Sequence, residues 1–134
     1  MVHESATSVT TTMAVRPILL IEDEPLVREA TTAMLESFGY VVRACGHGRE
    51  ALDLLRSAAC SPCLIILDFM MPDMDGATFI RERACEPAIA SIPLIMFSAR
   101  WDARETARRL GVPLVPKGPR VERLLRAVAD YCAA

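Results

Sequence analysis

Five short, mostly apolar runs, separated by stretches of helical length, constrain the fold of this chain more than any other feature. The runs are 17–21 (PILLI), 40–45 (YVVRAC), 63–67 (CLIIL), 93–97 (PLIMF) and 112–115 (VPLV). Strands that are apolar on both faces are typical of a parallel sheet covered by helices on both sides, because a one-sided sheet shows alternating residues. The sequence therefore predicts one α/β domain in which five strands alternate with five helices.

The stretches between these runs carry helical spacing and helix-boundary residues. Pro25 suits the first turn of a helix, and Gly39 is a natural stop. Between them, apolar residues recur at helical spacing: Leu26, Val27, Ala30, Ala33, Met34 and Phe38. A short helix is predicted around Ala51–Leu55, and longer ones are predicted over the following segments: about 77–85, 103–110 and 120–132.

Composition narrows the class of protein. Hydrophobic residues make up 52% of 134 residues, which is enough for a core without covalent support. The net charge of −2 and the 5% aromatic content argue against a protein that coats nucleic acid. No apolar run approaches the roughly 20 residues needed to cross a bilayer. Residues 1–14 lack a signal-peptide centre and are expected to be a disordered tail, so that 15–134 forms the domain and the protein is cytoplasmic.

The cysteines do not indicate a secreted disulfide framework, because their number is odd and their spacing is scattered. They are Cys45, Cys60, Cys63, Cys85 and Cys132. Cys60 and Cys63 form a CxxC, but no second pair completes a zinc site. Their interpretation as small buried hydrophobic residues is favoured over a redox pair.

Polar residues follow four of the predicted strands, at the edge where open α/β sheets bind ligands. They are Glu22, Asp23, Glu24, Asp68, Ser98 and Lys117. Each alone has an ordinary interpretation as a helix cap, a turn residue or a solvated charge, but four strand ends together favour a site. Carboxylates this close repel one another, and a divalent cation with oxygen ligands, Mg²⁺ above all, relieves the repulsion.

These residues resemble the receiver domains of two-component response regulators. The matching segments, in the family's order within about residues 16–132, are Ile21–Glu24, Leu64–Gly76, Ser98–Ala99 and Lys117. The run LIILDFMMPDMDG at 64–76 is the most specific of them. The resemblance implies a flavodoxin-like (βα)5 three-layer sandwich whose parallel sheet has the strand order 2-1-3-4-5.

The resemblance also implies a role for each matching residue. Asp68 would be the phosphoacceptor that forms an aspartyl phosphate. Mg²⁺ would be held by four groups: the carboxylates of Glu22, Asp23 and Asp68 and the backbone carbonyl of Met70. Ser98 and Lys117 would contact phosphoryl oxygens. Met70 and Arg100, two places beyond Asp68 and Ser98, lie where side chains screen or guide the attacking water.

Partners follow from the same resemblance. The phosphoryl group would come from a sensor histidine kinase or a histidine phosphotransfer protein, as in a phosphorelay. A stand-alone receiver would then present the face of its fourth helix, fifth strand and fifth helix to a protein partner, as a monomer or a phosphorylation-linked dimer. No direct nucleic-acid or membrane partner is expected. The domain would be no enzyme beyond catalysing its own phosphorylation and slow dephosphorylation.

The chain departs from the family's pattern around Lys117. The family usually places Pro directly after this Lys, whereas here Pro116 precedes it and Gly118 follows. Leu114 stands where the family usually has an aromatic residue. Only 19 positions separate Ser98 from Lys117, which indicates a shortened fourth helix and flanking loops.

These departures favour an alternative function, a pseudo-receiver that binds proteins independently of phosphorylation. The intact acidic cluster and Asp68 favour the phosphorylated switch. A third hypothesis, a phosphatase with an aspartyl nucleophile, is disfavoured because Met70 stands where such enzymes commonly carry a second Asp.

Overall fold

The computed structural model describes residues 15–68 and 76–133. Three predictions lie outside the described residues: the disordered tail at 1–14, the backbone carbonyl of Met70 as a metal ligand, and the Met70 side chain as a screen or guide for the attacking water. The description below concerns the remaining chain.

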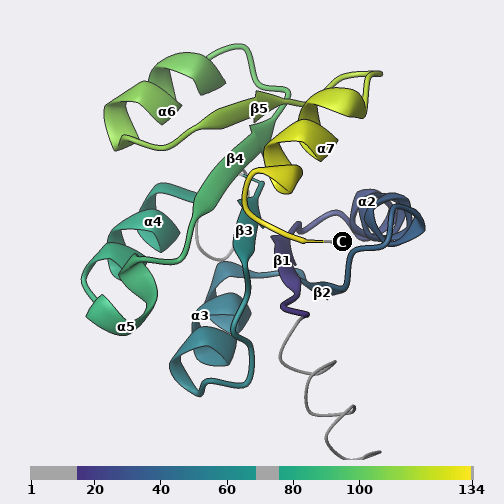
Figure 1. Cartoon of the computed structure of the whole chain (residues 1–134). Helices are drawn as coiled ribbons and strands as arrows, with labels where there is room; N and C mark the ends of the chain where they lie inside the picture. Colours follow the sequence, from purple (N-terminus) through teal and green to yellow (C-terminus); the bar gives the residue numbers. More distant parts are fainter. Residues whose placement is uncertain (1–14, 69–75, 134) are drawn as a thin grey trace, which may run out of the picture.

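Five strands and six helices form in the described part of the chain (Figure 1). The strands are β1 (Ile18–Ile21), β2 (Val42–Cys45), β3 (Leu64–Leu67), β4 (Leu94–Ser98) and β5 (Leu114–Pro116). The helices are α2 (Pro25–Ser37), α3 (Gly48–Arg56), α4 (Gly76–Ala84), α5 (Pro87–Ala90), α6 (Ala103–Leu110) and α7 (Glu122–Ala129). Every strand begins within two residues of its predicted start. The four-residue α5 was not predicted, and α7 is shorter than the predicted 120–132.

The strands form one parallel sheet in the order β2-β1-β3-β4-β5, which confirms the order that the resemblance implied. The register brings the strand ends to within two residues of one level, since Leu67 at the end of β3 lies opposite Met96 of β4. Ile21 at the end of β1 lies opposite Cys45 of β2 and Leu67 of β3, and Ser98 of β4 lies opposite Pro116 of β5. The residues that follow these strands therefore meet along one rim of the sheet.

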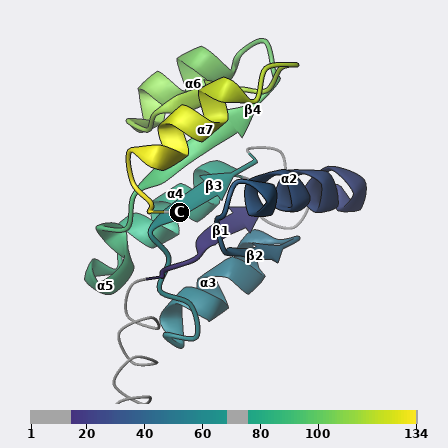
Figure 2. The same ribbon diagram turned by 45° about the vertical axis from the view of Figure 1, so that its right-hand side comes forward.

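Alternate strand residues face two helical layers, because successive side chains of a strand point to opposite faces. Leu19, Ile21, Ile65 and Leu67 pack with residues of α3, α4 and α5. Ile18, Leu20, Leu64 and Ile66 pack on the other face with residues of α2 and α7. Figures 1 and 2 show α2 and α7 on one side of the sheet and the other helices on the opposite side. These strand residues are almost fully buried, as the sequence predicted for a sheet covered twice.

The apolar residues that recur at helical spacing in α2 are largely exposed. Leu35 is the buried residue of this helix, whereas Leu26 is 75% exposed and Phe38 is 53% exposed. Val27 and Met34, with other side chains of α2, line an open hollow of about 270 Å³ towards the start of α7. The rotation of α2 about its own axis explains this exposure. The helix turns Leu35 towards the sheet, and its apolar stripe therefore faces away from the sheet, towards α7.

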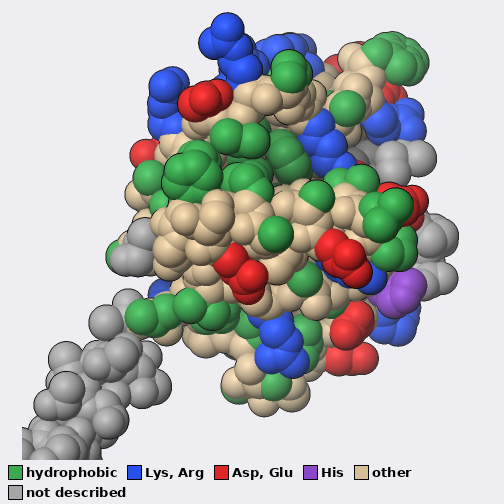
Figure 3. Space-filling model, turned by 90° about the vertical axis from the view of Figure 1, so that its right-hand side faces the viewer, with side chains coloured by type: hydrophobic (Ala, Val, Ile, Leu, Met, Phe, Trp, Pro, Cys, Tyr) green, Lys and Arg blue, Asp and Glu red, His purple; other side chains and the backbone are tan. Residues whose placement is uncertain are grey.

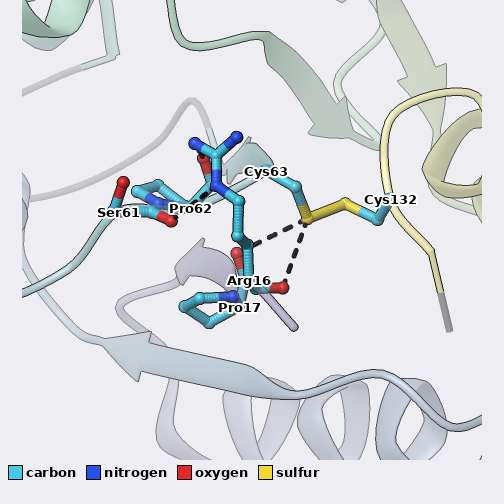
Figure 4. The surroundings of a disulfide bond; sticks show 6 residues. All are labelled: Arg16, Pro17, Ser61, Pro62, Cys63 and Cys132. Carbon is cyan, nitrogen blue, oxygen red and sulfur yellow. Dashed lines mark hydrogen bonds between the residues drawn. A yellow bond between two sulfur atoms is a disulfide. The ribbon is translucent and has the colours of Figure 1, made fainter. Parts of the chain in front are cut away.

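A disulfide joins Cys63, directly before β3, to Cys132, after α7, which corrects the interpretation of Cys63 as a buried hydrophobic residue (Figure 4). The two residues are 69 positions apart, so no local spacing signals the pair. The Cys63 sulfur also lies 3.5 Å and 3.6 Å from the carbonyl oxygens of Arg16 and Pro17. Cys60 is free and buried, as predicted; Cys45 is also free and buried, and Cys85 is free and exposed.

Among the described helices, none has both the length and the apolar character needed to cross a membrane.

Candidate functional site

Three carboxylates gather at the rim where β1 and β3 end. Glu22 and Asp23 follow β1, and Asp68 follows β3; one oxygen of each lies within 4.8 Å of the others. The backbone extends the sheet at this point, because the Glu22 N–H donates to the Cys45 carbonyl and the Asp68 N–H donates to the Ile21 carbonyl. Glu22 is only 3% exposed, and the other two carboxylates are half-buried. Three converging carboxylate oxygens are ligands that suit a hard divalent cation such as Mg²⁺.

Lys117 reaches this cluster from the end of β5. Its Nζ lies 2.9 Å from Oε1 of Glu22 and 4.0 Å from Oδ1 of Asp68. Its backbone N–H donates to the Ser98 carbonyl at 2.9 Å, which continues the pairing of β4 and β5 and fixes the direction from which the side chain approaches. The ammonium therefore offsets part of the negative charge and, through Glu22, competes with any cation for the same carboxylate.

Ser98 is buried and held within its own loop. Its Oγ accepts a hydrogen bond from the backbone N–H of Arg100 at 3.1 Å. The Arg100 guanidinium in turn donates to both carboxylate oxygens of Asp102 at 2.8 Å. These hydrogen bonds lower the pKa of the half-buried Asp102 carboxyl. The sequence predicted that the Arg100 side chain screens or guides attacking water. In the structure this side chain lies along the loop after β4 and is paired with Asp102.

Arg28 on α2 is a positioning residue that sequence reasoning missed. Its Nη1 donates to the backbone carbonyl of Glu22 at 2.9 Å. Gly46 leaves space for this contact, because a Cβ there would lie 2.9 Å from the same nitrogen. The Glu22 carboxylate accepts a weaker hydrogen bond from the Glu24 N–H at 3.3 Å. The sequence around Arg28 does not distinguish it from a solvated helix residue. Gly46, directly after β2, is a weak signal that another group approaches the backbone there.

The structure thus brings together Glu22, Asp23, Asp68 and Lys117, four of the residues singled out from the sequence. Ser98 adjoins Lys117 through the backbone hydrogen bond and shares with it a hollow of about 160 Å³. Arg100 and Leu114 also line this hollow.

Comparison with known proteins gives a consistent result. Residues 18–128 match the sequence profile of the response regulator receiver domain. An uncharacterized 14.6 kDa protein of Leptolyngbya boryana is 33% identical over 126 residues, which cover 92% of this chain and 95% of that protein. The receiver domain of a signal transduction histidine kinase from Syntrophus aciditrophicus superimposes with a TM-score of 0.76 at 31% identity, over 87% of this chain and 89% of that one.

A solved complex of the response regulator protein TrrA from Thermotoga maritima with Mg²⁺-BeF has the same fold. Its TM-score is 0.76 at 24% identity, over 87% of this chain and 99% of that one. Seven other curated relatives are longer proteins, and the chain spans between 7% and 48% of their lengths.

Proposed function

The chain belongs to the response regulator receiver domain family, and on that basis we propose that it is a switch phosphorylated on Asp68. Receiver domains are partnered with histidine kinases and are not enzymes in the ordinary sense. The observation that carries the proposal is the meeting of Glu22, Asp23 and Asp68 within 4.8 Å at the strand ends, with the Lys117 ammonium beside them. Carboxylates crowded in this way suit a phosphoryl-transfer site, where developing negative charge needs neutralisation.

In the proposed reaction, a carboxylate oxygen of Asp68 attacks the phosphorus of a phosphohistidine on a kinase or phosphotransfer protein. An O–P bond forms on Asp68, the N–P bond of the phosphohistidine breaks, and its imidazole leaves with the electron pair and takes up a proton. The nucleophile in this step is a carboxylate and not a hydroxyl or a thiol, so the step needs charge neutralisation more than a general base. Slow attack of water on the same phosphorus would reverse the modification.

The acidic cluster fits a bound Mg²⁺, for which we propose Glu22, Asp23, Asp68 and the backbone carbonyl of Met70 as ligands. When bound, the ion supplies positive charge to the phosphoryl oxygens. Arg28 holds the Glu22 backbone in place from α2. Lys117 offers its ammonium to a phosphoryl oxygen on the other side.

Ser98 and Lys117 would couple the modification to the surface. A phosphoryl group adds roughly 1.5 to 2 negative charges at Asp68. We expect the Lys117 ammonium to leave Glu22 and to contact a phosphoryl oxygen. We expect the Ser98 hydroxyl to give up the Arg100 N–H and to contact a second phosphoryl oxygen. Both residues flank β5, so the movement would reach the face formed by α6, β5 and α7, where a downstream protein partner would bind.

The alternative function, a pseudo-receiver, is favoured by the residues around Lys117. Leu114 cannot make the ring rotation of an aromatic side chain, and Pro116 and Gly118 flank the ammonium-bearing residue in an unusual order for the family. A pseudo-receiver would keep the fold and its protein contacts without taking up phosphate.

Intact-mass measurement distinguishes the two functions. The full chain is incubated with acetyl phosphate and Mg²⁺, and a gain of about 80 Da is expected from one phosphoryl group. Asp68→Asn should abolish the gain, and so should chelation of Mg²⁺. Asp53→Asn serves as a matched control, because Asp53 is exposed on α3 and outside the acidic cluster. A folded protein that gains no mass and binds no beryllofluoride would be a pseudo-receiver.

A further inference from the structure

The segment from α6 to α7 carries a charge opposite to that of the rest of the chain. Residues 103–129 contain seven Lys and Arg and two Glu, whereas the whole chain has 15 basic and 17 acidic residues. The remaining residues therefore have eight basic and 15 acidic side chains. Figure 3 shows Lys and Arg side chains gathered along the upper part of the molecule, where α6 and α7 lie in Figure 1. The basic charge is thus concentrated on one part of a nearly neutral protein.

Four exposed arginines border two adjoining hollows on the face of α6, β5 and α7. Arg104, Arg123 and Arg126 line a hollow of about 330 Å³. Arg120, Arg123 and Arg126, together with Lys117, line a second one of about 580 Å³. One carboxylate borders each hollow, Asp130 the first and Glu122 the second. We call these four arginines the arginine face.

None of these four guanidinium groups forms an ion pair or a side-chain hydrogen bond with any residue that the structure describes. Arg56 and Arg100, by contrast, are paired with carboxylates of their own surroundings. Arg123 and Arg126 lie three positions apart on α7, a spacing at which like charges on a helix repel each other. Their donors are therefore available for a partner, and a partner carboxylate would relieve the repulsion.

We propose that the arginine face binds an acidic segment of a protein partner, one that places carboxylates over the arginines and apolar side chains in the hollows. The inference deepens the proposed function, since it gives the chemistry of the partner at the output surface. Arginine is enriched in protein interfaces because its planar group binds carboxylates through two hydrogen bonds and also packs against apolar atoms.

The floor of the first hollow favours a protein segment over nucleic acid. Leu114, Val115, Pro116 and Ala127 line it beneath the arginines. A phosphate backbone would satisfy the charges but leave these apolar side chains uncovered, whereas an amphipathic acidic helix would cover both. A second copy of the chain, bound symmetrically through the same face, would set one net-basic patch against another, because each partner in a two-fold interface contributes the same patch.

The test is a binding titration by fluorescence anisotropy with the full chain, unphosphorylated and after acetyl phosphate treatment. The probe is a short labelled peptide of Glu and Leu at amphipathic helical spacing. The same peptide with Gln in place of Glu, and a DNA duplex of similar length, are compared with it. We expect binding of the Glu peptide only, and a loss of affinity when salt is raised from about 0.1 M to about 1 M.

Two double variants of equal charge test the location. Arg123→Gln with Arg126→Gln should weaken binding at least about tenfold, whereas Arg43→Gln with Arg49→Gln, exposed on β2 and α3, should change it less than about twofold. Arg104→Gln on α6 repeats the test from a different helix, should the first pair impair folding.

Equal loss in both double variants, or equal binding of the Gln peptide, would overturn the inference. Tighter binding of the DNA duplex would also overturn it and assign the face to nucleic acid. Mass spectrometry on the same samples separates the two proposals. A protein that is phosphorylated on Asp68 but ignores the Glu peptide refutes only the acidic partner. A protein that binds the peptide through the arginines but never gains a phosphoryl group refutes only the switch.

Discussion

The strand ends of β1 and β3 and those of β4 and β5 share one rim of the sheet, yet they hold their functional groups in different ways. At β1 and β3, Glu22, Asp23 and Asp68 already point to a common centre, and Arg28 fixes the Glu22 backbone. At β4 and β5, the Ser98 hydroxyl is engaged with its own loop, and Lys117 reaches across to Glu22.

This difference suggests separate tasks for the two halves of the rim: the half at β1 and β3 binds the ligand, and the half at β4 and β5 responds to it. The acidic half is assembled by the sheet register and the Arg28 contact, so that a cation would meet three carboxylates that are already gathered. In the half at β4 and β5, the proposed contacts of Ser98 and Lys117 with a phosphoryl group would require that both residues exchange their present partners. Changes in the first half should therefore alter ligand affinity, and changes in the second should alter stability and coupling.

The largest effect is expected from removing the disulfide between Cys63, directly before β3, and Cys132, after α7. Cys63→Ala with Cys132→Ala should lower the free energy of unfolding of the oxidised protein by about 4 kcal/mol, because the closed loop restricts the unfolded chain. Urea unfolding measures the difference. A reducing agent should remove most of it, and Mg²⁺ affinity should stay unchanged. Equal stability of the oxidised proteins would contradict the prediction.

Removing a carboxylate from the acidic half should come next. Asp23→Asn is expected to weaken Mg²⁺ binding at least about 100-fold, since even residues that only orient metal ligands contribute about 10- to 100-fold. Such a loss corresponds to about 2.7 kcal/mol. Calorimetric titration measures it. Glu24→Gln is the control, because Glu24 is the exposed neighbour outside the cluster. Similar losses in both variants would refute a specific role for Asp23.

A change at Lys117 should affect the metal-free protein most. Lys117→Met leaves the buried Glu22 carboxylate without its ammonium partner, which should lower the free energy of unfolding by about 2 kcal/mol. Saturating Mg²⁺ should recover part of this loss and should bind more tightly than to the unaltered protein, because its competitor is gone. Lys117→Arg, which keeps the charge, should lose less. Unfolding curves recorded with and without Mg²⁺ measure both effects. An unchanged Mg²⁺ affinity would contradict the competition between Lys117 and the cation for Glu22.

The smallest effect is expected from a substitution at Leu114, in the half at β4 and β5. Leu114→Tyr should change the free energy of unfolding by less than about 1 kcal/mol, because the side chain is half-buried beside an open hollow. The rate of labelling by acetyl phosphate should stay within about twofold, since the residue lies outside the acidic cluster. A tenfold slower labelling rate would show that the two halves are not separable in this way.

The sequence was sufficient for what depends on strand burial and topology. Runs such as 63–67 (CLIIL) predicted the doubly covered sheet, and sheet topology then brought Glu22 and Asp68 together. Features that depend on rotation and on distant packing were not predictable. The orientation of α2 followed from the burial of Leu35, not from its more apolar stripe, and the Arg28 contact with Glu22 depends on space at Gly46.

The disulfide gives two parts of the chain a different covalent connectivity, which does not follow the order of the strands in the sheet. The bond from Cys63 to Cys132 closes a ring that contains Asp68, Ser98 and Lys117, whereas Glu22 and Asp23 belong to an open arm outside it. A single backbone cut between 64 and 131 therefore leaves the oxidised protein as one covalent molecule. A cut between 24 and 62 instead yields two pieces, with the carboxylates of one site divided between them. The carboxylate of Asp68 and those of Glu22 and Asp23 would then be held together by noncovalent contacts alone, among them the pairing of β1 with β3 and the Lys117–Glu22 ion pair.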